Sequence, residues 1–188
     1  MRRIIVSMNI TVDGFMAEAD GGLDWQFNNW TADMAQSMGE QLSKADTILL
    51  GKNTYTAMAG YWPAMGNCLS QSRDDVAFAE MMNSYPKIVC SNTLTRLTWN
   101  NSRLISGKID QQISSLKQQA GKDIIIYGSG KLVASLIKSG LIDEYRLWVY
   151  PVSIGKGKSL FKNRQSMKLL NIRQFPSGVV VLNYEACG

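Results

Sequence analysis

Two glycine-containing turns are the stretches of this sequence whose residue types could bind an anion. Residues 51–54 follow the apolar run 46–50, and residues 127–132 (YGSGKL) close the apolar run that begins at 123. Where a strand leads into a helix, free backbone N–H groups and the positive end of the helix dipole point at one place, which suits a phosphate. Each turn taken alone is explained equally well as a tight connection, in which glycine is common.

Neither turn matches a standard nucleotide-binding motif. The third glycine of a G-x-G-x-x-G fingerprint starting at Gly128 would fall on Val133, and this turn follows a late strand. The fingerprint belongs to the first strand–helix unit of a domain. The G-x-x-x-x-G-K-[ST] pattern of a P-loop does not occur either. The residues therefore indicate an anion site without identifying the anion.

Alternating strand-like and helix-like segments would position these turns. Apolar, β-branched runs predict strands at 2–10, 46–50, 87–91, 102–106, 123–127 and 145–152, and a C-terminal hairpin at 167–186. The spacing of apolar residues and the capping signals predict helices at 31–45, from 53 to a break at Pro63, and at 76–85, 109–121 and 131–140. The stretches 15–30 and 66–74 are predicted to be loops.

This order of elements predicts an α/β fold in a single domain, residues 1–188. We expect a mostly parallel central sheet with an antiparallel C-terminal edge hairpin and helices on both faces. A chain of 188 residues suits one domain with its own core.

Composition narrows the classes of function. The net charge of +5 comes without a cluster of lysine and arginine, so we expect a small anionic ligand and no nucleic acid. No stretch is apolar enough to predict a membrane span. Cys68, Cys90 and Cys187 are far apart, which argues against a disulfide framework or a cysteine metal site and favours a reducing cytoplasm.

The sequence contains no histidine. This excludes histidine-based triads, histidine zinc sites and a histidine general acid or base. Proton transfer near neutral pH must therefore use a carboxylate, a tyrosine, a lysine, a cysteine or water.

Six segments that occur in order resemble a known family. They are S-M-N-x-T-V-D-G-F-M-A, G-G-L-D-W, A-D-T-I-L-L-G-K-N-T-Y, S-N-T-L, I-Y-G-S-G-K-L and G-L-I-D-E-Y-R-L-W-V-Y-P-V-x-x-G-K-G-K-x-L-F. Together they resemble the dihydrofolate-reductase-like family, in the branch related to the C-terminal reductase domain of bacterial bifunctional riboflavin-biosynthesis deaminase/reductases. The resemblance covers about residues 3–185. It implies a three-layer dihydrofolate-reductase-like fold and NADPH as hydride donor.

The resemblance also implies cofactor-binding positions. They lie on the first strand, in the two glycine turns and at the end of the strand 87–91: Ser7, Met8, Gly51, Lys52, Thr54, Ser91, Asn92, Tyr127, Gly128, Ser129, Gly130, Lys131 and Leu132. Lysine at 52 replaces the arginine of the family's turn, and Asn92 stands where many relatives carry a cation. Because classical dihydrofolate reductases have a cis peptide in the second turn, the resemblance predicts a cis peptide between Gly128 and Ser129.

Two aspartates are candidates for the catalytic acid. Asp33 lies roughly where dihydrofolate reductases place the carboxylate that holds the pterin, and Asp13 matches an aspartate in the first loop of the riboflavin-pathway relatives. Each also has a structural explanation: Asp33 as a carboxylate at a helix start, and Asp13 as part of an Asp-Gly turn.

The resemblance thus implies an NADPH-dependent reductase of a small planar heterocyclic, imine or carbonyl substrate, and the cysteine spacing favours the cytoplasm. The sequence predicts no metal site. The resemblance implies a homodimer, for which the strand 145–152 and the C-terminal hairpin offer apolar surface, although a buried core explains these two segments equally well. The alternatives are an NADP(H)-binding module without catalysis and a structural dimer with a degenerate pocket.

Overall fold

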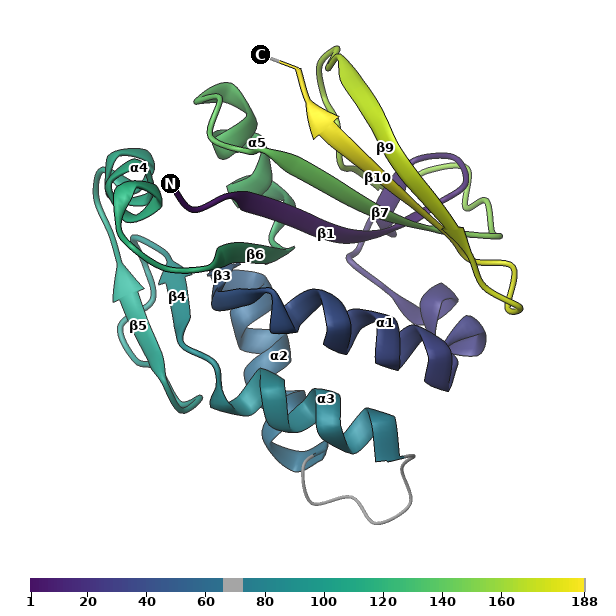
Figure 1. Ribbon diagram of the computed structural model, residues 1–188, viewed down its shortest axis with the longest axis horizontal. Coiled ribbons are helices and arrows are strands. Elements are labelled where there is room, and N and C mark those ends of the chain that lie inside the picture. Colours follow the sequence, from purple (N-terminus) through teal and green to yellow (C-terminus); the bar gives the residue numbers. More distant parts are fainter. Residues whose placement is uncertain (66–72, 188) are drawn as a thin grey trace.

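A central sheet with helices on both faces forms the fold (Figure 1). The computed structural model describes residues 1–65 and 73–187. Its strands are β1 (Ile4–Thr11), β2 (Phe15–Ala17), β3 (Ala45–Gly51), β4 (Lys87–Cys90), β5 (Ser102–Ile105), β6 (Asp123–Gly128), β7 (Glu144–Tyr150), β8 (Lys158–Ser159), β9 (Met167–Gln174) and β10 (Val180–Ala186). Its helices are the 3₁₀ helix η1 (Asp24–Asn29) and the α-helices α1 (Ala32–Ser43), α2 (Lys52–Met65), α3 (Arg73–Ser84), α4 (Ile109–Gln118) and α5 (Gly130–Lys138).

The large sheet has eight strands in the order β5-β4-β3-β6-β1-β7-β10-β9. The pairs from β5 to β7 are all parallel, whereas β10 runs antiparallel to both β7 and β9. This confirms the predicted α/β fold with an antiparallel edge hairpin. Because the six parallel strands point the same way, their carboxyl ends share one edge of the molecule.

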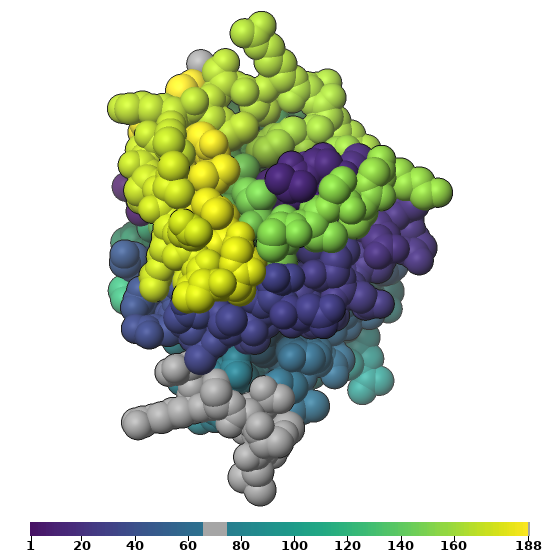
Figure 2. Space-filling model, turned by 90° about the vertical axis from the view of Figure 1, so that its right-hand side faces the viewer, coloured from purple at the N-terminus to yellow at the C-terminus, as the bar shows by residue number. Residues whose placement is uncertain are grey.

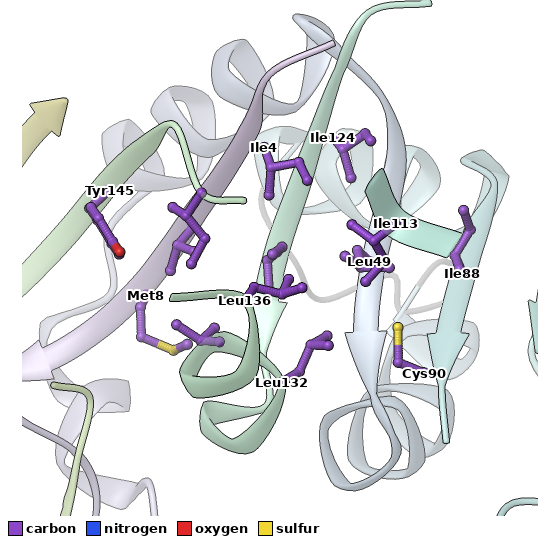
Figure 3. Close-up of a cluster of buried hydrophobic side chains, with 14 of the residues drawn as sticks. Ile4, Met8, Leu49, Ile88, Cys90, Ile113, Ile124, Leu132, Leu136 and Tyr145 are labelled. Atoms are coloured by element: carbon purple, nitrogen blue, oxygen red, sulfur yellow. The ribbon is translucent and has the colours of Figure 1, made fainter. Parts of the chain in front are cut away.

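Two hydrophobic cores lie on opposite faces of the sheet, since successive strand residues point to opposite sides. In β3, for example, Leu49 packs with α4 and α5 in one core, while Ile48 and Leu50 pack with α1 and α3 in the other. Figure 3 shows the first core, in which Leu132 and Leu136 of α5 lie among side chains of the strands, such as Ile4 and Met8 of β1 and Leu49 of β3. Helices therefore cover both faces, as predicted.

The helix α2 does not break at Pro63, which corrects one prediction. It continues to Met65 and contains Pro63 in its last turn. Proline removes one backbone donor and favours the end of a helix. So close to the end of α2, the loss of one hydrogen bond leaves most of the helix intact.

Two further differences concern the predicted loops. The stretch 15–30 contains β2, which pairs with β8 in a small antiparallel sheet, and the 3₁₀ helix η1. Of the predicted loop 66–74, residues 66–72 lie outside the described part of the chain, and α3 begins at Arg73. The short elements β2, β8 and η1 depend on tertiary contacts and leave little periodicity in the sequence.

Candidate functional site

The two glycine turns lie side by side at the carboxyl edge of the sheet. They follow β3 and β6, which are parallel neighbours, with Leu50 opposite Gly128. The end of β4 lies next to that of β3, with Cys90 opposite Gly51. The three predicted strand ends are therefore adjacent, and this edge is where ligands bind in open α/β sheets.

The two turns interlock so closely that their glycines have no room for a side chain. A Cβ atom on Gly51 would lie 3.0 Å from the backbone nitrogen of Ser129 and closer still to its hydroxyl. A Cβ atom on Gly128, whose φ is +135°, would lie 2.5 Å from Oγ1 of Thr54. Glycine is thus required at both positions by close approach, and at Gly128 also by a backbone conformation that other residues rarely adopt.

Side-chain hydrogen bonds connect the β3 turn to the ends of β4 and β5. Nζ of Lys52 donates to Oγ1 of Thr93 over 2.9 Å, which joins the start of α2 to the segment after β4. Oδ1 of Asn92 accepts a hydrogen bond of 2.7 Å from the N–H of Gly107, after β5. Oγ of Ser91 accepts from the N–H groups of the two residues after Asn92, at 3.1 and 3.0 Å. Ser91 and Asn92 therefore fix the shape of this edge.

The two helices that follow the glycine turns, α2 and α5, present positive charge without a local counterion. The first turns of α2 and α5 contain no acidic residue, whereas those of η1, α1 and α4 contain Asp24, Asp33 and Asp110. Lys52 and Lys131 form no ion pair within the described residues, and both are exposed. A helix start without a carboxylate can accept an anion from outside.

The amino edge of the sheet, in contrast, is a region of paired charges. Arg2 pairs with Asp46, and Nζ of Lys117 lies 2.6 Å from a carboxylate oxygen of Asp143. The asymmetry between the two edges supports an anion site at the carboxyl edge.

The start of α5 has further features that bear on the predictions. The peptide bond between Gly128 and Ser129 is cis, which confirms that prediction. Ser129 is the N-cap of α5 and makes no capping hydrogen bond with its side chain. The side chain of Leu132 is only 7% exposed and belongs to the core, so only its backbone N–H is available to a ligand.

Ser7 and Met8 point to opposite faces of the sheet. Met8 belongs to the core under α5. Ser7 faces α1, where its hydroxyl donates to Oε1 of Gln41 and accepts from Nε1 of Trp148, both over 3.2 Å. Because adjacent strand residues alternate, a ligand on the α1 face can meet Ser7 but not Met8.

Tyr127 belongs to the α1 face as well. It packs against the core that contains Met34, Met38 and Trp148, and its hydroxyl is buried without a hydrogen-bond partner within the described residues. Burial raises the pKa of this phenol well above its usual range, so the hydroxyl keeps its proton.

Asp13 is held by several hydrogen-bond donors. Its carboxylate accepts hydrogen bonds from the Thr11 hydroxyl at 2.5 Å, the Ser153 hydroxyl at 2.8 Å and the N–H groups of Ile154 and Gly155 at 3.1 and 2.8 Å. The bond from Thr11, followed by those from Gly155 and Ser153, lowers the pKa of Asp13 from 3.8 to about 2. Figure 2 shows the two segments that it joins, the first loop in purple and the loop after β7 in green.

Asp33 has fewer partners. It lies in the first turn of α1 and is partly exposed, and its Oδ1 accepts hydrogen bonds from the Thr31 hydroxyl and, at 3.1 Å, from the N–H of Met34. The second carboxylate oxygen has no hydrogen bond within the described residues and remains available for a ligand.

Three features of this region were not predicted. Met16 of β2 covers the start of α5, since a Cβ atom on Gly130 would lie 2.6 Å from its sulfur. Gln41 is buried on α1, and Asn9 donates to Oε1 of Gln26 over 2.6 Å. A glutamine on the apolar face of a helix and an asparagine inside an apolar strand are signals that the sequence does contain, whereas the position of Met16 depends on tertiary contacts.

Metal and membrane features are absent from the described residues. They contain no cluster of three or more aspartate, glutamate or cysteine side chains that could hold a metal ion. They also contain no helix that is both long enough and apolar enough to cross a bilayer.

A mostly parallel sheet with helices on both faces, two interlocked glycine turns at its carboxyl edge and a terminal antiparallel hairpin define the α/β fold of this chain. The chain belongs to the RibD C-terminal domain family, which it matches over residues 2–181. This confirms the resemblance to the riboflavin-pathway branch.

Comparisons with individual proteins agree with this family assignment and with the fold. The uncharacterized protein YyaP of Bacillus subtilis (strain 168) is 34% identical over 97% of this chain and 94% of its own. A crystal structure of a candidate riboflavin biosynthesis protein from Shewanella sp. PV-4 superposes with a TM-score of 0.76, at 21% identity and over 99% of both chains. The Thermotoga maritima diaminohydroxyphosphoribosylaminopyrimidine deaminase/5-amino-6-(5-phosphoribosylamino)uracil reductase superposes with a TM-score of 0.68 at 14% identity, over 99% of this chain and 57% of that protein. At these identities the structures show a common fold.

Proposed function

We propose that this protein is an NADPH-dependent reductase of a small planar heterocyclic, imine or carbonyl compound. The observation that carries the proposal is the pair of interlocked turns, where two helix starts without acidic residues meet beside Lys52 and Lys131. Membership of the RibD C-terminal domain family supports it, as does the reductase activity named for the Thermotoga maritima protein.

The residues at the carboxyl edge fit a dinucleotide phosphate. Gly51 and Gly128 are buried where the two turns interlock and bring the starts of α2 and α5 together, and the N–H groups of the first turn of α5 have no side-chain acceptor. Lys52, close to Thr93, would hold a phosphate on the β4 side, and Lys131 would face the pyrophosphate. Bound there, NADPH would supply the hydride.

Asp33 is the better candidate for the group that assists proton transfer. The oxygens of Asp13 already accept hydrogen bonds from four donor groups, which hold this carboxylate in its loop. Asp33 keeps one oxygen free. We therefore assign Asp13 to positioning of the first loop and Asp33 to contact with the substrate. Asp33 would orient the substrate and assist proton transfer to it, directly or through a water.

The α1 face of the sheet would hold the substrate. The ring of Trp25 meets Tyr150 edge-on at 5.2 Å, and the adjacent Asn9–Gln26 pair supplies amide groups. Aromatic walls with a few polar groups are typical of sites for flat heterocycles.

The test is NADPH oxidation, followed across a panel of pterins, pyrimidinones and quinones. We expect turnover with at least one compound, a fall of about 10²-fold or more in kcat for Asp33→Asn, and near-normal kcat for Asp13→Asn. Binding of NADPH without oxidation of any compound would favour a non-catalytic binding module. An unchanged kcat for Asp33→Asn would remove Asp33 from the account.

We also propose that two copies associate through β9. The strand 145–152 is β7, which lies inside the sheet and is largely buried, so it offers no interface. The edge strand β9, yellow-green in Figure 2, lies at the surface instead. Its side chains Leu169, Leu170 and Ile172 are 47%, 47% and 58% exposed. Antiparallel pairing of two β9 strands about Asn171 would place Leu170 against Ile172 of the other copy. Light scattering should give a dimer mass that Ile172→Lys halves; a monomer mass at all concentrations would reject this.

A further inference from the structure

A surface groove lies between the helix α4 and the edge strand β5, on the α4 face of the sheet. Its volume is about 380 Å³, within the range of about 300–1,000 Å³ that small-molecule sites occupy. None of the residues assigned above to the cofactor, the substrate or proton transfer lines it.

The groove has an apolar floor and a polar rim. Ile88, Ile105 and Leu116 form the floor and are 2%, 7% and 6% exposed. The rim consists of exposed side chains from β5, from α4 and from the residues that flank this helix: Arg103, Lys108, Gln111, Gln112, Ser115 and Gln119.

The charge of the groove has one sign. Arg103 and Lys108 line it, and no carboxylate does. Asp110, in the first turn of α4, is held instead by the hydroxyls of Ser135 and Ser139, at 3.1 and 2.7 Å, and these residues belong to α5 and its C-cap. The nearest acidic residue of α4 is therefore occupied on the other side of the helix, and the cations of the groove remain available to a ligand.

We propose that this groove is a second binding site, for a small amphipathic anion. A flat or branched apolar body would cover the floor formed by Ile88, Ile105 and Leu116. A carboxylate, sulfonate or phosphate would lie between Arg103 and Lys108, and the amides of the rim would supply further hydrogen bonds. The end of the groove at Lys108 lies near the carboxyl edge of the sheet. Lys108 directly follows Gly107, whose N–H donates to Oδ1 of Asn92 at that edge.

The probe is anilinonaphthalene sulfonate (ANS), which combines a naphthalene body with one sulfonate. ANS fluorescence would be titrated against the folded protein with and without saturating NADPH, and ¹⁵N-labelled protein would locate the probe by NMR. Arg103→Glu reverses the charge of the rim, and Ser115→Trp fills the groove from the middle of α4. Lys138→Glu, at the exposed end of α5, is the matched control for a reversed charge outside the groove.

We expect one ANS molecule per chain, amide shifts at Arg103, Gln112 and Ser115, and little effect of NADPH. Arg103→Glu should weaken ANS binding about tenfold or more, Ser115→Trp should abolish it, and Lys138→Glu should leave it unchanged. The proposal is overturned if ANS does not bind, if NADPH displaces it, or if both groove variants bind it like the wild type. Lys131→Ala lies outside the groove, so a change in its NADPH affinity tests the cofactor site and leaves the groove proposal unaffected.

Discussion

The contact between Gly51 and Ser129 makes a quantitative prediction about the two turns. Gly51→Ala would place a Cβ atom 3.0 Å from the backbone nitrogen of Ser129, 3.1 Å from its Cβ and closer still to its hydroxyl. Both turns are fixed by parallel strands, with Leu50 opposite Gly128, so neither can retreat freely. Overpacking of this kind costs about 1–3 kcal/mol, and we expect Gly51→Ala to lower the free energy of unfolding by about that much.

Ser129→Gly removes two of the three close contacts and leaves the backbone nitrogen in place. Alone it should cost about 0.5–1 kcal/mol, because glycine is the more flexible residue. In the double variant the alanine meets less obstruction, so the two losses should be less than additive, with a coupling energy of about 1 kcal/mol.

The assay is urea unfolding of the wild type, both single variants and the double variant, with equal m-values as the check on two-state behaviour. NADPH binding by the four proteins should follow the same pattern. Additive losses within about 0.3 kcal/mol, or a harmless Gly51→Ala, would show that the two turns do not touch as described.

The remaining predictions concern Lys131, Lys87 and Asp13. Lys131→Ala should weaken NADPH binding about tenfold, equivalent to ~1.4 kcal/mol, whereas Lys138→Ala at the other end of α5 should not; equal effects in a calorimetric titration would reject a phosphate at the start of α5. Lys87→Met should cost about 3 kcal/mol, because the buried Nζ donates to the carbonyls of Met82, Asn83 and Tyr85 that would lose their partner. Burial lowers the pKa of Lys87 from 10.5 to about 8. Between pH 8 and 10.5 the amine of Lys87 is therefore protonated in the unfolded chain and neutral in the folded protein, so this residue makes the free energy of unfolding rise with pH. Urea midpoints between pH 8 and 10 should show this rise in the wild type and not in Lys87→Met. The pKa of Asp13 is lower in the folded protein, at about 2, than its ordinary value of 3.8, so this carboxylate stabilises the fold above about pH 3.8 and the stabilisation is lost as the pH falls through about 2. An NMR titration of the Asp13 carboxyl with a midpoint near 4 would contradict the hydrogen bonds from its four donor groups.

The position of the candidate site could be predicted because it follows from topology. Once the strands ending at Gly51, Cys90 and Gly128 are parallel neighbours, their ends must meet at one edge, and the alternation of strand and helix signals already implies this. The opposite directions of the Ser7 and Met8 side chains also follow from the two-residue period of a strand, so the sequence already indicates that the two side chains face different sides of the sheet.

The partners of Asp13 and Gly130 could not be predicted in the same way. Asp13 accepts hydrogen bonds from residues 140–142 positions further along the chain, in the loop after β7. Met16 lies on β2, which pairs with β8, and its side chain reaches Gly130 at the start of α5. Contacts between loops of this kind depend on the assembled sheet, and neither composition nor periodicity specifies them.

Binding of NADPH to ¹⁵N-labelled protein, followed by calorimetry and NMR together, tests the central claim most directly. The account predicts one NADPH per chain, with the largest amide shifts at Gly51, Lys52, Gly128 and Lys131, and a stabilisation of ~2.7 kcal/mol at a hundredfold excess over Kd. No binding at millimolar NADPH, or amide shifts that leave both turns unchanged, would contradict it.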